Sequence, residues 1–194
     1  MDKATKKKLL ENAIDLKALV YGDFTLSSGL KSNFYFDGRL LSMDPESSQI
    51  IAKWIIDLSI KHKIRFIGGP AVAAVPLIGA TVAMSANTEN PLSGFFVRSD
   101  KKDHGTQKQI EGNIQPNSSV IVLDDTISTG GSLFQAISAI EDFGCNISLV
   151  LSVLDRKMGG SEQILNKGFH YESIFEINPD GEFVWKNQFQ KRIL

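Results

Sequence analysis

The run of residues 120–132 constrains the fold of this chain most, and it reads Val-Ile-Val-Leu-Asp-Asp-Thr-Ile-Ser-Thr-Gly-Gly-Ser. Its apolar start, residues 120–123, has the length and β-branching of a buried strand. Asp124 and Asp125 follow at the end of that strand, and a short loop of hydroxyl and glycine residues comes next. The periodic apolar segment 133–143 is typical of a helix. The run therefore predicts a strand, a polar loop and a helix N-terminus in direct succession.

Such a succession can bind an anion. Backbone N–H groups point outward at a helix N-terminus, and the helix dipole favours negative charge there. Gly130 and Gly131 would let the backbone approach a phosphate closely. Asp124 and Asp125 could hold vicinal ribose hydroxyls, directly or through a metal ion. The alternative is an ordinary strand–helix turn with a capped helix, and Asp-Asp at a strand end also occurs in other magnesium sites.

Bulk properties narrow the class of protein. The chain has 194 residues, which fits a single domain spanning 1–194. Its formal net charge of −1 gives no reason to expect binding to nucleic acid or to an anionic membrane. The single cysteine, Cys145, predicts a buried thiol and a reducing compartment. Because no segment is typical of a signal peptide or a membrane span, we expect a cytoplasmic protein.

Predicted strands and helices alternate from about residue 50 to 177. This alternation indicates an α/β fold with a parallel twisted sheet flanked by helices. In such sheets, ligands bind beyond the carboxyl ends of the strands. The loops 68–71, 98–112, 124–132 and 155–156 all follow predicted strands. We therefore expect them to gather at one edge of the sheet.

Two segments lie outside this alternation. They are about 1–45 and 178–194, and we expect them to form a small hood lobe over a core of about 46–177. Apolar residues at helical spacing between positions 9 and 20 predict a single helix there. Another segment, 99–112, is mostly charged or polar without an apolar period, which predicts a long loop.

The run 120–132 resembles the phosphoribosyl pyrophosphate (PRPP) motif of the type I phosphoribosyltransferases. The resemblance implies the type I phosphoribosyltransferase fold. In that family the two acids face the ribose 2′ and 3′ hydroxyls, and the loop wraps the 5′-phosphate. It therefore implies PRPP binding by Asp124, Asp125, Thr126, Ile127, Ser128, Thr129, Gly130, Gly131 and Ser132.

Three further segments resemble the orotate phosphoribosyltransferase family. Residues 24–37 look like its N-terminal hood, and residues 98–112 look like its mobile catalytic loop. Leu154-Asp155-Arg156 stands where that family places an arginine that reads the orotate carboxylate. The matches extend from residue 24 to 156 in the order and spacing of the family.

The resemblance also assigns roles around the PRPP motif. Catalytic roles fall to Lys102, His104, Asp124 and Asp125, and PRPP contacts are added by Arg98, Ser99, Lys102 and His104. Orotate contacts fall to Ser128, Arg156, Tyr35 and Phe36. The cofactor implied is Mg²⁺, held mainly by PRPP, with the two acids as further candidate ligands. A homodimer is implied, because in the family the loop reaches into the active site of the partner subunit.

The residue types suit these roles, although each has a simpler alternative. A guanidinium is the natural bidentate partner of a carboxylate, whereas a surface arginine capping a strand is the alternative for Arg156. Cations on a closing loop would stabilise a pyrophosphate leaving group, whereas the alternative is a solvated charged loop. Tyr35 and Phe36 could equally belong to the core of the hood.

The sequence departs from the family at three positions. Ser99, Ala73 and Ser27 stand where members of the family have lysine. A lost lysine removes a point charge from a site for a polyanion, so we expect weaker PRPP affinity or a slower rate without loss of activity. Lys101, two positions after Ser99, is a candidate for compensation.

The function expected from the resemblance is magnesium-dependent transfer of phosphoribose from PRPP to orotate. The products would be orotidine 5′-monophosphate and pyrophosphate, in de novo pyrimidine (UMP) biosynthesis. Two alternatives remain open from the sequence. One is a transferase for another base, such as a purine, and the other is a PRPP-sensing regulator without catalysis.

Overall fold

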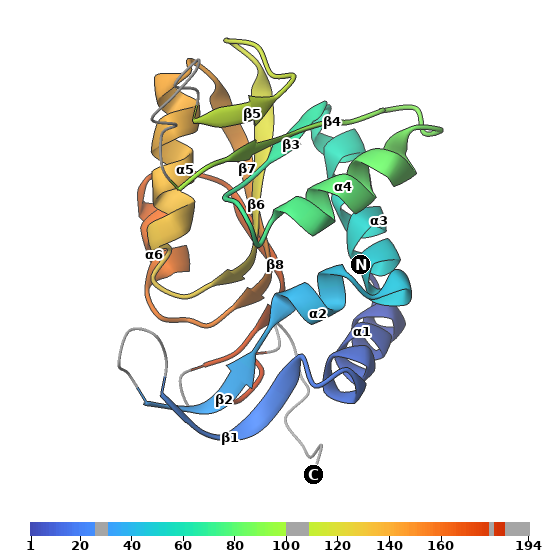
Figure 1. The fold of residues 1–194 in the computed structure, drawn as a ribbon, viewed down its shortest axis with the longest axis vertical. Coiled ribbons are helices and arrows are strands. Elements are labelled where there is room, and N and C mark those ends of the chain that lie inside the picture. The colour runs from blue at the N-terminus through green and yellow to red at the C-terminus, as the bar shows by residue number, and fades with distance from the viewer. Residues whose placement is uncertain (26–30, 100–108, 179–180, 185–194) are drawn as a thin grey trace.

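The structure, a computed structural model, describes residues 1–25, 31–99, 109–178 and 181–184 (Figure 1). Its helices are α1 (Lys3–Asp15), α2 (Gly38–Ser42), α3 (Pro45–His62), α4 (Val75–Ser85), α5 (Gly131–Asp142) and α6 (Gly160–Asn166). Its strands are β1 (Leu19–Thr25), β2 (Lys31–Phe36), β3 (Phe66–Gly68), β4 (Ser93–Val97), β5 (Ile110–Gly112), β6 (Ser119–Ile127), β7 (Asn146–Asp155) and β8 (Tyr171–Glu176).

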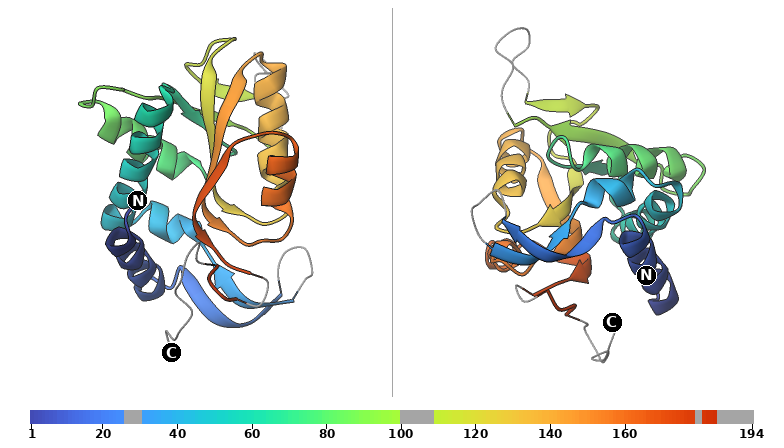
Figure 2. Two further views of the ribbon diagram at one scale, coloured as in Figure 1. Left: turned by 180° about the vertical axis from the view of Figure 1, so that it is seen from behind. Right: turned by 60° about the horizontal axis from the view of Figure 1, so that its bottom comes forward.

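A six-stranded sheet with the order β5-β4-β3-β6-β7-β8 forms the centre of the molecule. All neighbouring pairs are parallel except β4 and β5, which are antiparallel. Helices α3 and α4 lie on one face of this sheet, and α5 and α6 lie on the other (Figures 1 and 2). The predicted α/β class with a mostly parallel sheet is confirmed.

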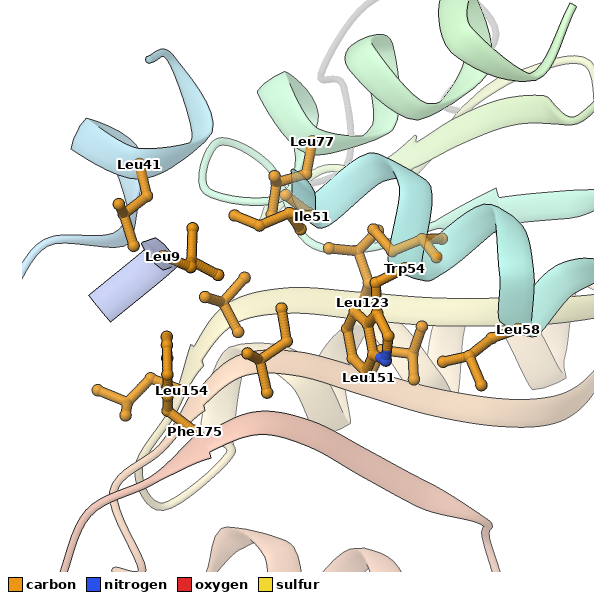
Figure 3. Packing of buried hydrophobic residues seen from close by; sticks show 14 of the residues in the cluster. Leu9, Leu41, Ile51, Trp54, Leu58, Leu77, Leu123, Leu151, Leu154 and Phe175 are labelled. Atoms are coloured by element: carbon orange, nitrogen blue, oxygen red, sulfur yellow. The ribbon is translucent and has the colours of Figure 1, made fainter. Parts of the chain in front are cut away.

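Strand β6 is apolar at consecutive positions because both of its faces are covered. Ile121 and Leu123 belong to the core cluster beneath α3 and α4. Figure 3 shows Leu123 in this core together with Trp54 and Leu77. Val120 and Val122 pack into the second core, beneath α5 and α6. Burial on both sides holds this strand rigidly at the centre of the sheet, and it is the strand that carries the two acids of the motif.

Strands β1 and β2 form a separate antiparallel pair at the end of the sheet where β6 and β7 finish (Figure 1). The described part of the C-terminal tail comes close to this pair, since a Cβ added to Gly181 would lie 2.7 Å from Oδ1 of Asn33. The remaining tail residues, 185–194, lie outside the described residues. The division into a hood and a core therefore stays a prediction.

The prediction of one helix through position 20 is wrong. Helix α1 ends at Asp15, Lys17 adopts a left-handed backbone conformation (φ 55°), and β1 begins at Leu19. Leu19 is paired with Phe36 of β2. The apolar residues between 9 and 20 thus belong to two elements, and a contact with a distant strand overrides the helical spacing of the second group.

The predicted loop 99–112 and the predicted strand end also need correction. Residues 110–112 form β5, which pairs with β4 and extends the sheet at its edge. Strand β6 continues to Ile127, so Asp124 and Asp125 lie within the strand and do not follow it. The reason is that β7 continues the ladder beyond the apolar run, with Asp124 opposite Ser152 and Ile127 opposite Asp155.

A smaller prediction about the single cysteine agrees with the structure. Cys145 is 5% exposed, and its thiol lies 3.3 Å from the carbonyl oxygen of Gln115, so the predicted buried thiol is confirmed. Within the part of the chain that the structure describes, no helix combines the length and the apolar character needed to cross a membrane.

Candidate active site

The loops after β3, β4, β6 and β7 meet at one edge of the sheet, as predicted. The N–H of Ala71, after β3, donates to the carbonyl of Val97 at the end of β4 (2.8 Å). The N–H of Arg156, after β7, donates to the carbonyl of Ile127 at the end of β6 (2.8 Å). These backbone contacts hold the strand ends in a fixed arrangement.

Two adjacent acids form the floor of this site. Asp124 and Asp125 are 4% and 9% exposed at the carboxyl end of β6. Burial raises the pKa of both carboxyl groups, and the negative charge of Asp125 raises that of Asp124 further. Oδ1 of Asp124 accepts the N–H of Asp125 (2.9 Å), and Oδ2 lies 3.4 Å from the Ser132 hydroxyl. The protein therefore stabilises the two ionised carboxylates poorly. A ligand that supplies hydrogen-bond donors or a cation would stabilise them.

A short turn joins the floor to helix α5. Gly130 is the N-cap of α5 and adopts φ +85°, a conformation that L side chains rarely adopt. The carbonyl of Ser128 accepts the N–H of Gly160 (3.0 Å), which anchors the turn to α6. The first turn of the twelve-residue α5 contains no acidic residue. Its free N–H groups and its dipole are therefore suited to a phosphate.

The predicted phosphate-binding residues divide into two groups. Ser128, Thr129, Gly130, Gly131 and Ser132 lie in the turn or in the first residues of α5. Two others belong to the last part of β6, and they are Thr126 and Ile127. The side chain of Ile127 is 1% exposed and packs in the core, so only backbone atoms of this residue remain for a ligand.

A cavity of about 310 Å³ opens beside Asp125. Its lining residues are Tyr35, Phe36, Asp37, Gly38, Arg39, Val72, Ala73 and Asp125. Residues of β2, of α2 and of the loop after β3 thus share one space with the floor. Gly38 lies so close to the floor that an added Cβ would be 2.7 Å from Oδ2 of Asp125.

Sequence reasoning identified Tyr35, Phe36, Ala73 and Asp125 for this neighbourhood but missed Gly38 and Arg39. The available signal was a glycine between two opposite charges, Asp37-Gly38-Arg39, directly after an aromatic strand. The side chain of Tyr35 is 40% exposed, whereas that of Phe36 is 7% exposed and belongs to the core. The core interpretation therefore fits Phe36 better than Tyr35.

Arg39 and Asp37 form a bidentate ion pair at the cavity. Nε of Arg39 lies 2.8 Å from Oδ1 of Asp37, and Nη2 lies 2.8 Å from Oδ2. These hydrogen bonds lower the pKa of the Asp37 carboxyl. Asp37 also caps α2, since its Oδ1 accepts the N–H of Arg39 (3.1 Å). The geometry at this side of the cavity is therefore set before any ligand binds.

Arg156 lies at the end of β7 and reaches across to β2. Its Nη2 donates to the hydroxyl of Ser32 (3.2 Å) and to the carbonyl of Phe34 (3.4 Å), and its guanidinium lies 4.5 Å from the centre of the Phe34 ring. Burial lowers the pKa of Arg156, which is only 7% exposed. The surface-arginine alternative is therefore wrong, and the residue stands between the sheet edge and the β1–β2 pair.

The predicted catalytic loop is described only at its two ends. Arg98 follows β4, and its backbone N–H donates to the carbonyl of Gln109 (2.9 Å). Its Nε is buried and has no hydrogen-bond partner among the described residues. Ser99 is exposed. Two residues predicted to act from this loop, Lys102 and His104, lie outside the described residues, and Lys101 and Ser27 lie outside them as well.

The donor set fits a magnesium ion shared with a substrate. Among the described residues, no group of three or more His, Cys, Asp or Glu side chains is arranged to hold a metal. Asp124 and Asp125 are two buried carboxylates with raised pKa values. Mg²⁺ commonly binds through one or two carboxylates together with substrate phosphates and water, and this pair meets that requirement.

Comparison with known proteins gives a consistent result. The phosphoribosyl transferase domain family matches residues 44–190. The orotate phosphoribosyltransferase of Rhodopirellula baltica is 32% identical over 174 residues, covering 87% of this chain and 90% of that protein. The enzyme of the same name from Pyrococcus abyssi is 36% identical over 166 residues, covering 84% of this chain and 88% of that protein.

Solved structures agree. The orotate phosphoribosyltransferase of Mycobacterium tuberculosis in complex with Fe(III) dicitrate has a TM-score of 0.75 and 30% identity, covering 89% of this chain and 96% of that chain. The same enzyme in complex with PRPP has a TM-score of 0.72 and 28% identity, again covering 89% and 96%. The chain therefore belongs to the phosphoribosyltransferase family of enzymes, and within it to the orotate phosphoribosyltransferases, with the type I fold that its sequence predicted.

Proposed function

We propose that this protein catalyses the magnesium-dependent transfer of phosphoribose from PRPP to N1 of orotate. The products are orotidine 5′-monophosphate and pyrophosphate, in de novo pyrimidine (UMP) biosynthesis. The observation that carries the proposal is the buried pair Asp124 and Asp125, which stands directly before a glycine turn into α5 and beside a cavity. Relatives that bear the name orotate phosphoribosyltransferase and cover most of this chain support it.

The transfer forms a bond between N1 of orotate and C1 of the ribose. The bond between C1 and the pyrophosphate oxygen breaks, its electron pair leaves with pyrophosphate, and the N1 proton of orotate passes to solvent. Positive charge develops on the ribose as this bond weakens. Asp124 and Asp125 accept hydrogen bonds from the ribose hydroxyls and offset that positive charge, an effect that is stronger in a buried site than in water.

The remaining binding roles follow from the positions of the other side chains. The N-terminal N–H groups of α5 and the hydroxyls of Ser128, Thr129 and Ser132 bind the 5′-phosphate. Asp124 and Asp125 would be further ligands of a Mg²⁺ ion held mainly by PRPP, and the ion would supply partial neutralisation of the pyrophosphate charge.

Arg156 is the proposed partner of the orotate carboxylate. Its guanidinium is held by contacts to Ser32 and Phe34, which leaves a planar cation positioned between β7 and β2. A positioned guanidinium loses little conformational freedom when it binds a carboxylate. Tyr35, Phe36 and Ser128 are proposed to complete the base site.

The catalytic loop and the assembly are also part of the proposal. Arg98, Ser99, Lys102 and His104 act on the pyrophosphate when the loop closes and excludes water. Because the family places this loop in the active site of a partner subunit, we propose a homodimer with shared active sites. We also propose a cytoplasmic location without nucleic-acid or membrane partners.

A turnover assay tests the proposal directly. Purified protein, PRPP and Mg²⁺ are combined with orotate, uracil, adenine or hypoxanthine, and pyrophosphate release is followed for each base. We expect turnover with orotate and none with the bases that lack a carboxylate. Turnover with a purine instead would reassign the base. PRPP binding in calorimetry without turnover of any base would establish the regulatory alternative.

A further inference from the structure

The charge of the cavity beside Asp125 is unusual for a polyanion site. Among the described residues that line it, Asp37 and Asp125 carry negative charge and Arg39 carries the one positive charge. Ala73 also lines this cavity, and it presents a methyl group where some members of the family have lysine. A diphosphate entering this space would meet two carboxylates, so it needs the guanidinium of Arg39.

The geometry of the ion pair leaves Arg39 available to a second anion. A guanidinium has five N–H donors in a rigid fork. The pair with Asp37 engages Nε and Nη2, so the two N–H groups of Nη1 are outside it. The Arg39 side chain is 55% exposed, which gives a ligand access to that edge. Asp37 therefore orients the guanidinium through Nε and Nη2 and leaves the Nη1 donors outside the pair.

Arg39 also lies close to the floor of the site. The neighbouring residue, Gly38, has no room for a Cβ against the Asp125 side chain, so the backbone of α2 packs directly on this acid. The positive charge of Arg39 partly opposes the rise that burial causes in the pKa of Asp125. A ligand bound to Asp125 and filling the cavity would therefore be within reach of the guanidinium.

We propose that Arg39, oriented by Asp37, binds the diphosphate group of PRPP in this cavity and supplies the positive charge that Ala73 does not. The inference rests on the proposed function for the identity of the ligand. It explains how a chain that lacks three of the family's lysines retains a cation in the described part of the pyrophosphate site. Arg39 is a substrate-binding residue in this proposal, and Asp37 is its positioning residue.

The test compares Arg39→Ala and Arg39→Gln with Arg65→Ala. Arg65 is an exposed arginine before β3, at the opposite end of the sheet, because the next residue pairs with Val120 at the start of β6. Calorimetry measures the affinity for magnesium pyrophosphate and PRPP, and steady-state kinetics measures both KM values. Loss of one charge-assisted contact should weaken pyrophosphate and PRPP about 10- to 100-fold, with the orotate KM changed less than about twofold.

A rescue variant separates ligand binding from a structural role. Ala73→Lys in the Arg39→Ala background places a cation at another position that lines the same cavity, and we expect it to restore at least part of the pyrophosphate affinity. A purely structural Arg39 would not be replaced from position 73. Unchanged pyrophosphate affinity in both Arg39 variants would overturn the proposal. Equal weakening of orotate and PRPP, with a lowered Tm and no rescue, would overturn it too.

The binding measurement also keeps this inference separate from the proposed function. If the wild type binds pyrophosphate through Arg39 but does not turn over orotate, the cation site stands and the base assignment fails. If the wild type turns over orotate and the Arg39 variants bind pyrophosphate normally, the base assignment stands and the cation site fails. If the wild type binds neither PRPP nor pyrophosphate, both fail.

Discussion

The carboxylates of the site lie in two regions with opposite electrostatics. On the sheet side, Asp124 and Asp125 are buried next to each other, and burial raises their pKa values. On the β2–α2 side, Asp37 is paired with Arg39, and hydrogen bonds from the guanidinium lower the pKa of its carboxyl group. An ionised carboxylate is thus destabilised on the sheet side of the site and stabilised on the β2–α2 side.

This difference indicates that the two sides of the site bind different parts of a ligand. Among the residues that the structure describes, the sheet side has no partner of opposite charge as close as the one that Asp37 has, so it gains most from ligand hydroxyls or from a bound cation. The Asp37–Arg39 pair on the β2–α2 side is already oriented, so we expect it to bind an anion without first rearranging. A ligand with hydroxyls at one end and a diphosphate at the other would complement both the sheet side and the β2–α2 side.

Removing one floor acid should have the largest effect. Asp125→Asn keeps the size of the side chain but removes the charge that offsets the ribose cation. We expect kcat/KM for PRPP to fall about 10²- to 10³-fold, the magnitude seen when one electrostatic contact to a transition state is lost. Asp57→Asn, at an exposed position of α3, is the matched control. Equal kcat/KM in the two variants would show that the floor has no electrostatic role.

The second largest effect is expected on orotate binding when Arg156, which reaches from β7 to β2, is removed. Arg156→Ala should raise the orotate KM about 10- to 100-fold, because it removes the charged partner of the carboxylate. Ser32→Ala deletes one hydrogen-bond partner of Arg156 and retains the guanidinium. We expect its orotate KM to stay within about fivefold of the wild type. If Ser32→Ala and Arg156→Ala raise the orotate KM equally, Arg156 acts through the β1–β2 pair and not on the base.

A smaller effect is expected from a substitution at the contact between α2 and Asp125. Gly38→Ala places a Cβ 2.7 Å from Oδ2 of Asp125, so either α2 or the Asp125 side chain must shift. We expect a loss of about 1–3 kcal/mol in the free energy of unfolding and weaker PRPP binding. Gly79→Ala is the control, since an added Cβ meets nothing within 4 Å in the middle of α4. It should stabilise the protein by about 0.5–1 kcal/mol, and denaturant unfolding measures both variants.

The pH dependence of stability probes the floor without any ligand. A carboxyl group with a raised pKa in the folded state binds more protons than it does in the unfolded state, so stability falls as pH rises from about 4 toward the raised value. Asp124→Asn removes this titrating group and its effect on stability. We expect its Tm to exceed that of the wild type at pH 8 by about 2–4 °C, corresponding to about 1 kcal/mol, with the difference shrinking toward pH 4. Thermal unfolding across this range would contradict the raised pKa if the difference stayed constant.

The smallest effect is expected at the exposed end of the catalytic loop. Ser99→Lys restores a cation that the family usually has there, at an exposed position where screening by water is strong. We expect a two- to fivefold gain in PRPP affinity or in rate, measured by steady-state kinetics. No change in either quantity would show that Ser99 does not limit PRPP binding.

Several features of the fold could be predicted because their causes are local in the sequence. The start of α3 has such a local cause, because the side chain of Asp44 accepts the N–H of Ser47 and Pro45 occupies the first turn. The burial of Cys145 and the order of strand, glycine turn and helix at 120–132 agree with the sequence prediction. The segment after position 15 failed, because pairing with β2 converts an apparently helical stretch into β1.

The sequence by itself determined the floor and the phosphate turn, since a doubly buried strand, two acids and a glycine at positive φ are all encoded within residues 119–132. Only the tertiary structure decided what faces them. Arg156 reaches Ser32 across 124 positions of the chain, and Gly38 packs against Asp125. Hydrophobic periodicity and turn chemistry act over a few residues, whereas these contacts depend on how β2 and α2 pack against the edge of the sheet, which no local pattern specifies.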